Sequence, residues 1–456
     1  MALQATQSPQ PTITLLTTNT PSWTAPVVEA NISDQNTPEP IVPAMPTNTP
    51  VPNTPEPTVP AMLTDTPVPN TPEPTVPVML TDTPVPNTPE PTIPAVLTDT
   101  PVSNTPEPTD APAEELSGIP AASGIRVMRV EYANFSNSRG EVSWWEEQMK
   151  ASGINMVALG AGRVEWAFFK WAGHEANWSG VVEDTGIDFL AEDSARYGQW
   201  ADINAVIDVF SPNYITSNPD KAAINVLGER SPNLVSTAEL VHGAFGQMLL
   251  DMVGYIAANY PNVDSISITE LFYRIDGYGP DDLALYTAAT GQVDWPRQSN
   301  GQVDIDDPSI GNWRSAVLGE FLGRATAIAH QYGKQLFMDV GISYGNLSLM
   351  TNNKGTNYNV MLQNVDKIVV WDYFGEDGYA PEISRDIGAY LTQFGNDRVI
   401  LSIGLWGISG TTVTATDFNT AIQSAQAGGM PNLWICPGSM MSSDHWQSLK
   451  ALWGPG

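Results

Sequence analysis

Short apolar runs rich in β-branched residues alternate with longer amphipathic segments from Gly124 onward. The short runs have the length and composition of strands, and the segments between them have the period of helices. We expect strands that begin at Arg126, Asn155, Ile203, Asp264, Gln335, Lys367, Arg398 and Asn432. We expect helices over Val142–Ala151, Ile187–Trp200, Thr237–Asn259, Trp313–Gly333, Asn359–Val365, Glu382–Phe394 and Thr416–Ala427.

This alternation is typical of a parallel sheet whose strands are joined by crossover helices. Eight such repeats predict an α/β fold of the closed type, a (β/α)₈ TIM barrel, over residues 119–456. A doubly wound open sheet is the alternative. That fold normally carries a glycine-rich phosphate loop after its first strand, and the segment RVEYANF contains no glycine.

Residues 1–118 follow a different pattern, a Pro/Thr-rich repeat with a period of 17 residues. One copy reads NTPEPTVPAMLTDTPVP from Asn53, and near copies begin at Asn36, Asn70 and Asn87. Each proline fixes φ and removes a hydrogen-bond donor, so these repeats cannot stack into a solenoid. We therefore expect a disordered, extended linker that acts as a stalk for the barrel.

The chain is strongly acidic, with 50 acidic and 19 basic residues and a net charge of −31, and this charge limits the kinds of partner that it can bind. Such a surface repels phosphate backbones, so we expect no nucleic-acid partner. Runs of 18 apolar residues are absent, so we expect no membrane insertion. Thr with Pro is typical of extracellular stalks. We therefore expect a secreted or cell-surface protein, associated with a surface or cell wall through the stalk.

The first residues, MALQATQSPQPT, lack the basic and apolar segments of a secretion signal. We favour a leader that is missing from the chain over export by another route.

Carboxylates recur at the predicted C-terminal ends of the strands, where barrels of this type place their function. They are Glu131, Asp208, Glu270, Asp339 and Asp372. One or two could cap a helix or pair with an arginine, but unpaired carboxylates are costly to bury. Five at one end of a barrel indicate a site for acid/base chemistry.

Glu270 is the expected general acid, because it ends the apolar run ISIT and is followed by Leu-Phe-Tyr. Apolar surroundings raise the pKa of a carboxyl group and keep it protonated. Asp372, between Trp371 and Tyr373, is the expected second carboxylate, as nucleophile, base or electrostatic stabiliser. The alternative for both is a structural role as a helix cap or ion pair.

Aromatic residues point to a carbohydrate substrate, since flat rings suit the CH faces of pyranoses. Of 14 tryptophans, all but Trp23 lie outside the stalk. Filling of the core is the alternative, which we accept for Trp144, Trp145, Trp200, Trp313 and Trp446. The expected substrate-binding residues are Asp208, Asp339, Asp276, Tyr273, Tyr373, Trp166, Trp371, Trp406 and Trp434.

Three segments, ITELFYRIDGYGPDD, HQYGKQLFMDV and VVWDYFG, resemble the glycosyl-hydrolase-like TIM-barrel superfamily. The resemblance is distantly to chitinase-type and biofilm-polysaccharide hydrolases. It implies that Glu270 is the acid and that Asp372 and Tyr373 line the sugar subsite. Chitinase-type enzymes have an aspartate two residues before the acid, where this chain has Ile268. The resemblance therefore favours a pair of protein carboxylates over acetamide-assisted catalysis.

Other hydrolase classes fit the sequence less well. The four histidines are scattered, so we expect no metal site, and the GxSxG motif of serine hydrolases is absent. We expect no cofactor. The sequence predicts an extracellular glycoside hydrolase that cleaves O-glycosyl bonds of a polysaccharide or oligosaccharide. The alternative is a non-catalytic carbohydrate-binding barrel displayed on a stalk.

Overall fold

The structure is a computed structural model that describes residues 124–131, 142–349 and 355–455. The predicted stalk, residues 1–118, and its boundary with the barrel domain lie outside these ranges.

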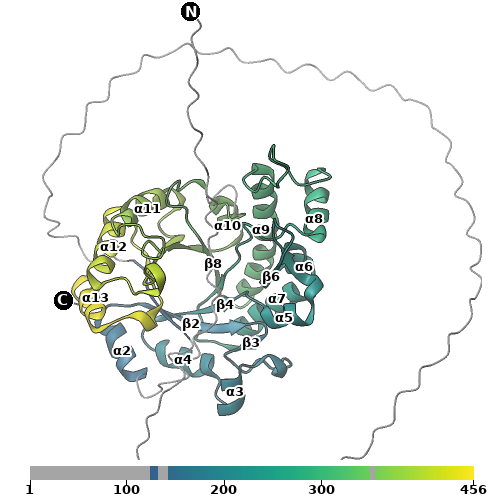
Figure 1. The fold of residues 1–456 in the computed structure, drawn as a ribbon. Coiled ribbons are helices and arrows are strands. Elements are labelled where there is room, and N and C mark those ends of the chain that lie inside the picture. Colours follow the sequence, from purple (N-terminus) through teal and green to yellow (C-terminus); the bar gives the residue numbers. More distant parts are fainter. Residues whose placement is uncertain (1–123, 132–141, 350–354, 456) are drawn as a thin grey trace, which may run out of the picture. The chain divides into compact units, whose positions relative to one another are not determined.

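The described chain folds into a closed barrel of eight parallel strands with helices between them (Figure 1). β1 pairs with both β2 and β11, which closes the ring. All eight predicted strands are confirmed, and closure excludes the open doubly wound sheet. The barrel strands are β1 (Arg126–Val130), β2 (Met156–Arg163), β4 (Asp202–Asp208), β7 (Ser265–Thr269), β8 (Gln335–Val340), β9 (Lys367–Asp372), β10 (Val399–Gly404) and β11 (Leu433–Cys436).

The crossover helices match the predicted ones closely, and a helix that was not predicted follows the last strand. The predicted helix Thr237–Asn259 is two helices, because Gly243 is extended and the Glu239 carboxylate accepts from Phe245 N–H (3.0 Å). The helices are α2 (Val142–Ala151), α4 (Phe189–Tyr197), α6 (Thr237–His242), α7 (Ala244–Asn259), α9 (Pro308–His330), α10 (Tyr358–Asn364), α11 (Ile383–Leu391), α12 (Ala415–Ala427) and α13 (Ser443–Trp453).

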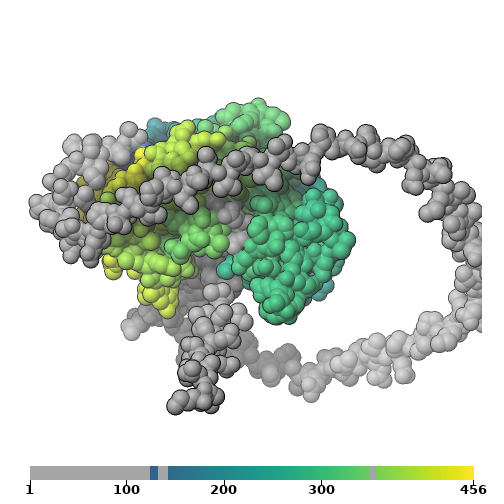
Figure 2. Space-filling model, turned by 90° about the horizontal axis from the view of Figure 1, so that it is seen from above, coloured from purple at the N-terminus to yellow at the C-terminus, as the bar shows by residue number. Residues whose placement is uncertain are grey.

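Insertions that the periodicity did not predict follow β2, β4 and β7. They hold β3 (Trp166–Ala167), α3 (Gly180–Thr185), α5 (Pro212–Ser217), β5 (Ala222–Ile224), β6 (Arg230–Val235) and α8 (Pro280–Thr290). The last two insertions gather on one side of the barrel in Figure 1, beside α6 and α9. The teal-to-green lobe in Figure 2 contains this region. The C-terminal end of β7 therefore leads directly into one of these insertions.

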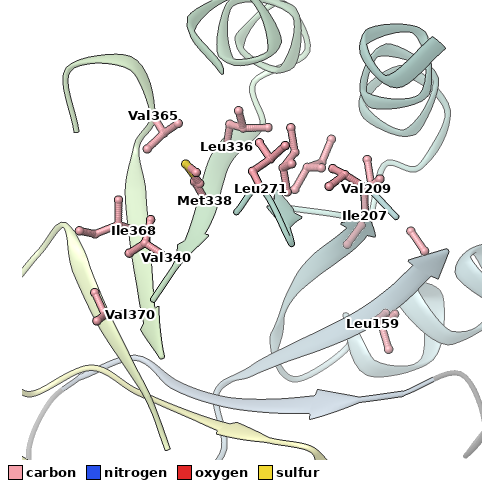
Figure 3. Packing of buried hydrophobic residues seen from close by; sticks show 14 of the residues in the cluster. Leu159, Ile207, Val209, Leu271, Leu336, Met338, Val340, Val365, Ile368 and Val370 are labelled. Atoms are coloured by element: carbon pink, nitrogen blue, oxygen red, sulfur yellow. The ribbon is translucent and has the colours of Figure 1, made fainter. Parts of the chain in front are cut away.

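Side chains alternate between two buried faces along each barrel strand. One set fills the inside of the barrel: Val127, Met156, Ala158, Val206, Phe337, Val369, Ile400 and Trp434. The other set packs against the helices, and Figure 3 shows part of it, including Ile207, Met338, Ile368 and Val370. A strand-end residue therefore faces the inside or the helices according to its position in this alternation. No helix in the described ranges is long and apolar enough to cross a membrane.

Candidate active site

The inward-facing strand ends bring four carboxylates and two arginines together, which we call the mouth cluster. Asp208 and Asp339 share the inner face with Val206 and Phe337, two positions earlier in their strands. Arg129 of β1 follows Val127 by the same spacing. The mouth cluster consists of Arg129, Glu131, Arg163, Asp208, Glu270 and Asp339.

Glu270 enters this cluster through an unusual backbone turn. Two and four residues earlier, Ile268 and Ile266 face the helices, so simple alternation would turn Glu270 outward. Its φ of 70° is left-handed, a conformation that few residues other than glycine adopt. The turn ends β7 and carries the Glu270 side chain to the mouth cluster, where Asp208 and Asp339 act on its charge.

The pKa of Glu270 is raised well above its ordinary value, chiefly by burial and then by the negative charges of Asp208 and Asp339. The positive charges of Arg163 and Arg129 oppose this shift in pKa only in part. Glu270 therefore keeps its proton to a higher pH than an exposed glutamic acid does. A proton donor requires this property.

Asp208 is held as an ion pair at the rim of the cluster. Its Oδ2 accepts from Nε and Nη2 of Arg163 at 2.8 and 2.7 Å, and its Oδ1 accepts from Phe210 N–H at 2.8 Å. Both oxygens are therefore engaged. Each side chain of the pair keeps 25% of its surface exposed, so solvent and ligands can reach this part of the cluster.

Asp339 has a free oxygen at the same end of the barrel. Its Oδ2 accepts from Trp371 Nε1 (3.3 Å), and the Thr269 hydroxyl also donates to the carboxylate. Its Oδ1 is buried and has no partner among the described residues. Burial raises the pKa of Asp339 to about 6, against the opposing charge of Arg129.

Glu131 is the fourth carboxylate of the mouth cluster. Its Oε2 accepts from Ser439 N–H (3.2 Å), and burial raises its pKa while Arg129 lowers it. Glu131 is one of the five carboxylates predicted at the strand ends, although no catalytic or binding role was predicted for it, whereas Arg129 of the same strand is not among the predicted site residues.

A row of aromatic rings borders the carboxylates. Ring centroids lie 4.8 Å apart for Phe272 and Trp371, 5.0 Å for Trp371 and Tyr373, and 4.8 Å for Tyr373 and Trp406. The Trp371 and Tyr373 rings are stacked, with 13° between their planes. The structure therefore brings three predicted residues, Trp371, Tyr373 and Trp406, into one row.

Two neighbours fix Tyr373 in this row. Its hydroxyl is hydrogen-bonded to the Cys436 thiol, and burial is the main cause of its raised pKa. A Cβ at Gly404 would lie 2.4 Å from Cδ1 of Tyr373, so only glycine leaves room for the ring. Cys436 ends the last barrel strand, β11, and so adds a residue to the site that is not among the predicted site residues.

Asp372 does not join the mouth cluster. It shares the outer face of β9 with Ile368 and Val370, and its side chain is fully buried. Oδ2 accepts from the Ser384 hydroxyl of α11 (2.5 Å), Oδ1 accepts from the Tyr344 hydroxyl (3.1 Å), and Phe374 N–H also donates. Burial raises its pKa to about 6. The structure therefore does not bring Asp372 together with Glu270, although the sequence predicts this pair.

Two of the predicted substrate rings belong to the core instead. Trp434 is 2% exposed inside the barrel among Val127, Phe337 and Ile400, because it lies two residues below the strand end. Tyr273 is 1% exposed and packs in the outer core. Neither ring has a free face for a substrate.

The remaining predicted residues, Asp276 and Trp166, lie outside the ring row. Trp166 of β3 is half-buried and packs edge-on against Phe168. Asp276 is half-buried in the loop after β7, and burial raises its pKa. These positions leave their role in substrate binding a prediction.

The loop after Glu270 is held by a buried arginine. Arg314 of α9 is 0% exposed and donates to the carbonyl groups of Tyr273, Asp276 (3.0 Å) and Gly277 (3.1 Å). The rings of Tyr273, Tyr278 and Trp313 surround its guanidinium at 5.0–5.8 Å. Among the described residues no carboxylate lies within ion-pair distance of Arg314, and its charge is balanced by these carbonyl groups together with the more distant carboxylates of Asp276 and Asp282.

Comparisons with known proteins bear on the fold. No protein-family model and no curated protein matches the chain. The glycoside hydrolase domain of PgaB (BpsB) from Bordetella bronchiseptica superposes with a TM-score of 0.54 at 14% identity, over 73% of this chain and 99% of that one.

Two further solved structures are similar. The β-galactosidase of the psychrophilic Marinomonas ef1 gives a TM-score of 0.53 at 11% identity, over 72% of this chain and 58% of that one. The catalytic domain of a β-amylase from Paenibacillus polymyxa gives 0.50 at 12%, over 73% and 98%. The chain is thus similar to glycoside hydrolases in the fold of its barrel.

Proposed function

We propose that this protein is a glycoside hydrolase in which Glu270 is the proton donor and Asp339 the second carboxylate. The observation that carries the proposal is the inward turn of Glu270 onto Asp208 and Asp339, which raises its pKa. Carboxyl groups with unequal proton affinities at one site are the requirement for acid-assisted cleavage of a glycosidic bond.

Asp339 suits the second role better than Asp208 does. Both oxygens of Asp208 are engaged, by Arg163 and by Phe210 N–H. Asp339 keeps Oδ1 without a partner among the described residues. Asp208 then holds Arg163 in place and keeps Glu270 protonated through its negative charge.

In the proposed reaction Glu270 donates its proton to the glycosidic oxygen, which leaves with the electron pair of the broken C–O bond. Asp339 stabilises the positive charge that develops on the sugar ring. It bonds to the anomeric carbon when the carboxyl groups lie about 5 Å apart, or takes a proton from the attacking water at roughly 6.5–9.5 Å. In the first case water then adds its oxygen to the anomeric carbon while the bond to Asp339 breaks and the Glu270 carboxylate takes the proton of the water. In the second case the water that Asp339 deprotonates adds directly as the glycosidic bond breaks.

The proposed substrate is a neutral or cationic polysaccharide or oligosaccharide. The row of aromatic rings next to the carboxylates supports a carbohydrate substrate, because aromatic side chains pack well against the CH groups of pyranose units. Four carboxylates against two arginines would repel an anionic sugar. The Pro/Thr-rich repeats of residues 1–118 support a secreted or surface-attached location.

Glu270→Gln tests the proposal, because the amide is nearly isosteric but has no proton to donate. We expect turnover of polysaccharides to fall by at least about 10²-fold while glycan binding persists. Release of reducing ends from a panel of soluble polysaccharides measures turnover, and Glu183→Gln on the exposed face of α3 is the matched control. Unchanged turnover in Glu270→Gln would contradict the assignment. Glycan binding by the wild type without cleavage of any member of the panel would favour the non-catalytic barrel.

A further inference from the structure

The outward-facing Asp372 holds a tyrosine that supports an exposed ring. Tyr344 follows β8, and its hydroxyl donates to Asp372 Oδ1 at 3.1 Å. Its ring is stacked on that of Tyr379, with centroids 4.5 Å apart and 23° between the planes. Tyr379 itself is 44% exposed. A chain of contacts therefore runs from a fully buried carboxylate to an aromatic face in solvent.

The turn that carries Tyr379 is tightly held. Tyr379 N–H donates to the carbonyl group of Phe374 (2.8 Å), and Glu376 N–H donates to that of Tyr373 (3.0 Å). Gly378, at a φ of 74°, lies against Ile408, whose side chain is 60% exposed. The loops after β9 and β10 thus each present an exposed apolar side chain, and Ile408 lies against the residue that precedes Tyr379.

The turn that carries Tyr379 starts at the ring row of the candidate active site. Tyr373, a member of that row, begins the same turn that ends at Tyr379. A Cβ at Gly375 would lie 2.7 Å from the carbonyl oxygen of Trp406, so the turn packs directly on the loop that carries the last ring. One short, packed turn therefore joins the ring row to Tyr379.

We propose that Tyr379, backed by Tyr344 and flanked by Ile408, binds a pyranose unit of a polysaccharide outside the bond that is cleaved. We call this surface the Tyr379 platform, and the proposal rests on the function proposed above. The exposed carboxylates of Glu376 and Asp377 in the same turn favour a neutral or cationic unit over an anionic one. Asp372 is a positioning residue for this platform, because it fixes the phenol on which Tyr379 rests.

Rigidity is what suits the platform to sugar binding. A sugar ring gains only modest stacking energy from one aromatic face, so ordering a mobile side chain would cancel much of it. Tyr344 is fixed at its hydroxyl by Asp372 and at its face by Tyr379, and Ser384 in turn fixes Asp372. The ordering is complete before the ligand arrives.

Tyr379→Ala tests the platform, with Tyr379→Phe as the variant that keeps the ring. The matched control is Tyr332→Ala, because Tyr332 is 49% exposed in the turn before β8, at the opposite end of the barrel. KM and kcat are measured on the polysaccharide that the wild type cleaves and on its short oligomers. Binding to hydroxyethyl cellulose, glycol chitin and soluble starch is measured by affinity electrophoresis in the Glu270→Gln background.

We expect Tyr379→Ala to raise KM for the polymer about three- to tenfold, with a smaller change in kcat and in KM for the shortest oligomer. Tyr379→Phe should restore the wild-type KM, and Asp372→Asn should raise KM for the polymer in the same direction. Cleavage with an unchanged KM in Tyr379→Ala would overturn the platform and leave the proposed function standing.

The two proposals can also fail in the other order. Glycan retardation that Tyr379→Ala abolishes, in a protein that cleaves nothing, would support the platform and contradict the hydrolase. Absence of both cleavage and retardation would overturn both.

Discussion

Glu270 and Asp372 follow apolar strands in the same barrel and stand next to aromatic residues, yet they belong to different environments. Around Glu270 the neighbours are charged, namely Asp208, Asp339 and Arg163. Around Asp372 they are neutral donors, namely the hydroxyls of Ser384 and Tyr344 and the Phe374 N–H. Burial raises the pKa of both carboxyl groups. The neighbours, rather than burial, therefore distinguish the proposed proton donor from a carboxylate with a structural role.

The difference has a chemical meaning. Like charges next to Glu270 favour its protonated form, so the group can give up a proton to a substrate. Three donors around Asp372 favour its ionised form and leave little capacity for a ligand. Substitutions at the two regions should therefore change different measured quantities, chiefly kcat in the mouth cluster and chiefly the free energy of unfolding at Asp372.

The largest expected effect is that of Asp339→Asn on activity. Loss of the second carboxylate should lower kcat by about 10²–10⁴-fold, because the amide neither attacks nor takes a proton. The pKa of Asp339 is raised to about 6, so its contribution to stability is lost as the pH rises through 6. The neutral amide should then leave the free energy of unfolding at pH 7.5 unchanged or higher.

Steady-state kinetics and urea denaturation check both parts of this prediction. Full activity in Asp339→Asn, with Asp208→Asn inactive, would assign the second carboxylate to Asp208 instead.

Asp372→Asn should lower the stability of the protein more than its activity, the reverse of Asp339→Asn. The amide offers one acceptor oxygen where the carboxylate accepts from two hydroxyls and an N–H, so at least one buried donor loses its partner. We expect the free energy of unfolding to fall by about 1–3 kcal/mol. We expect kcat to stay within about tenfold of the wild type, a far smaller loss than removal of a proton-transfer group causes. Urea denaturation and kinetics on one preparation measure both, and a kcat as low as that of Asp339→Asn would return Asp372 to the catalytic pair.

The smallest expected effect is on the pH dependence of kcat/KM, which distinguishes the titration of Asp339 from that of Asp372. Activity should rise as the pH increases through about 6, where Asp339 becomes ionised. Activity should fall at higher pH, where Glu270 loses its proton through its raised pKa. Both limbs should persist in Asp372→Asn, although the pKa of Asp372 is also about 6. Disappearance of the low-pH limb in that variant would show that the titration belongs to Asp372.

The barrel was predictable because each strand is a compact apolar run that must be buried on both faces. Because both faces of each strand are apolar, the sequence does not indicate which residues point into the barrel and which point toward the helices. The segment KIVVWDY is apolar on both faces of β9, so nothing in it marks Asp372 as outward. The insertion after β7 was not predicted, because its helix α8 lies in a polar, glycine-containing segment without a strong apolar stripe.

For Glu270, counting along the strand gives the wrong face. Counting from Ile266 and Ile268 would place it among the helices, and only the left-handed turn reverses this. Its position at a strand end followed by aromatic residues was nevertheless sufficient to identify it as a candidate. Asp208 and Asp339 were identified by the same rule, whereas their unequal hydrogen bonding depends on Arg163 and Trp371, which come from other strands.

Arg314 fixes the segment that follows Glu270. Its guanidinium is closed in by three rings and bound to three carbonyl groups of the segment that follows Glu270. Opening that segment would expose an uncompensated charge to an apolar core, a state that is costly to populate. We therefore expect the segment after Glu270 to stay packed on α9 in the folded protein. Under the proposed function, a polymer would then enter and its fragments leave at other parts of the rim, and motion of this segment would not limit turnover.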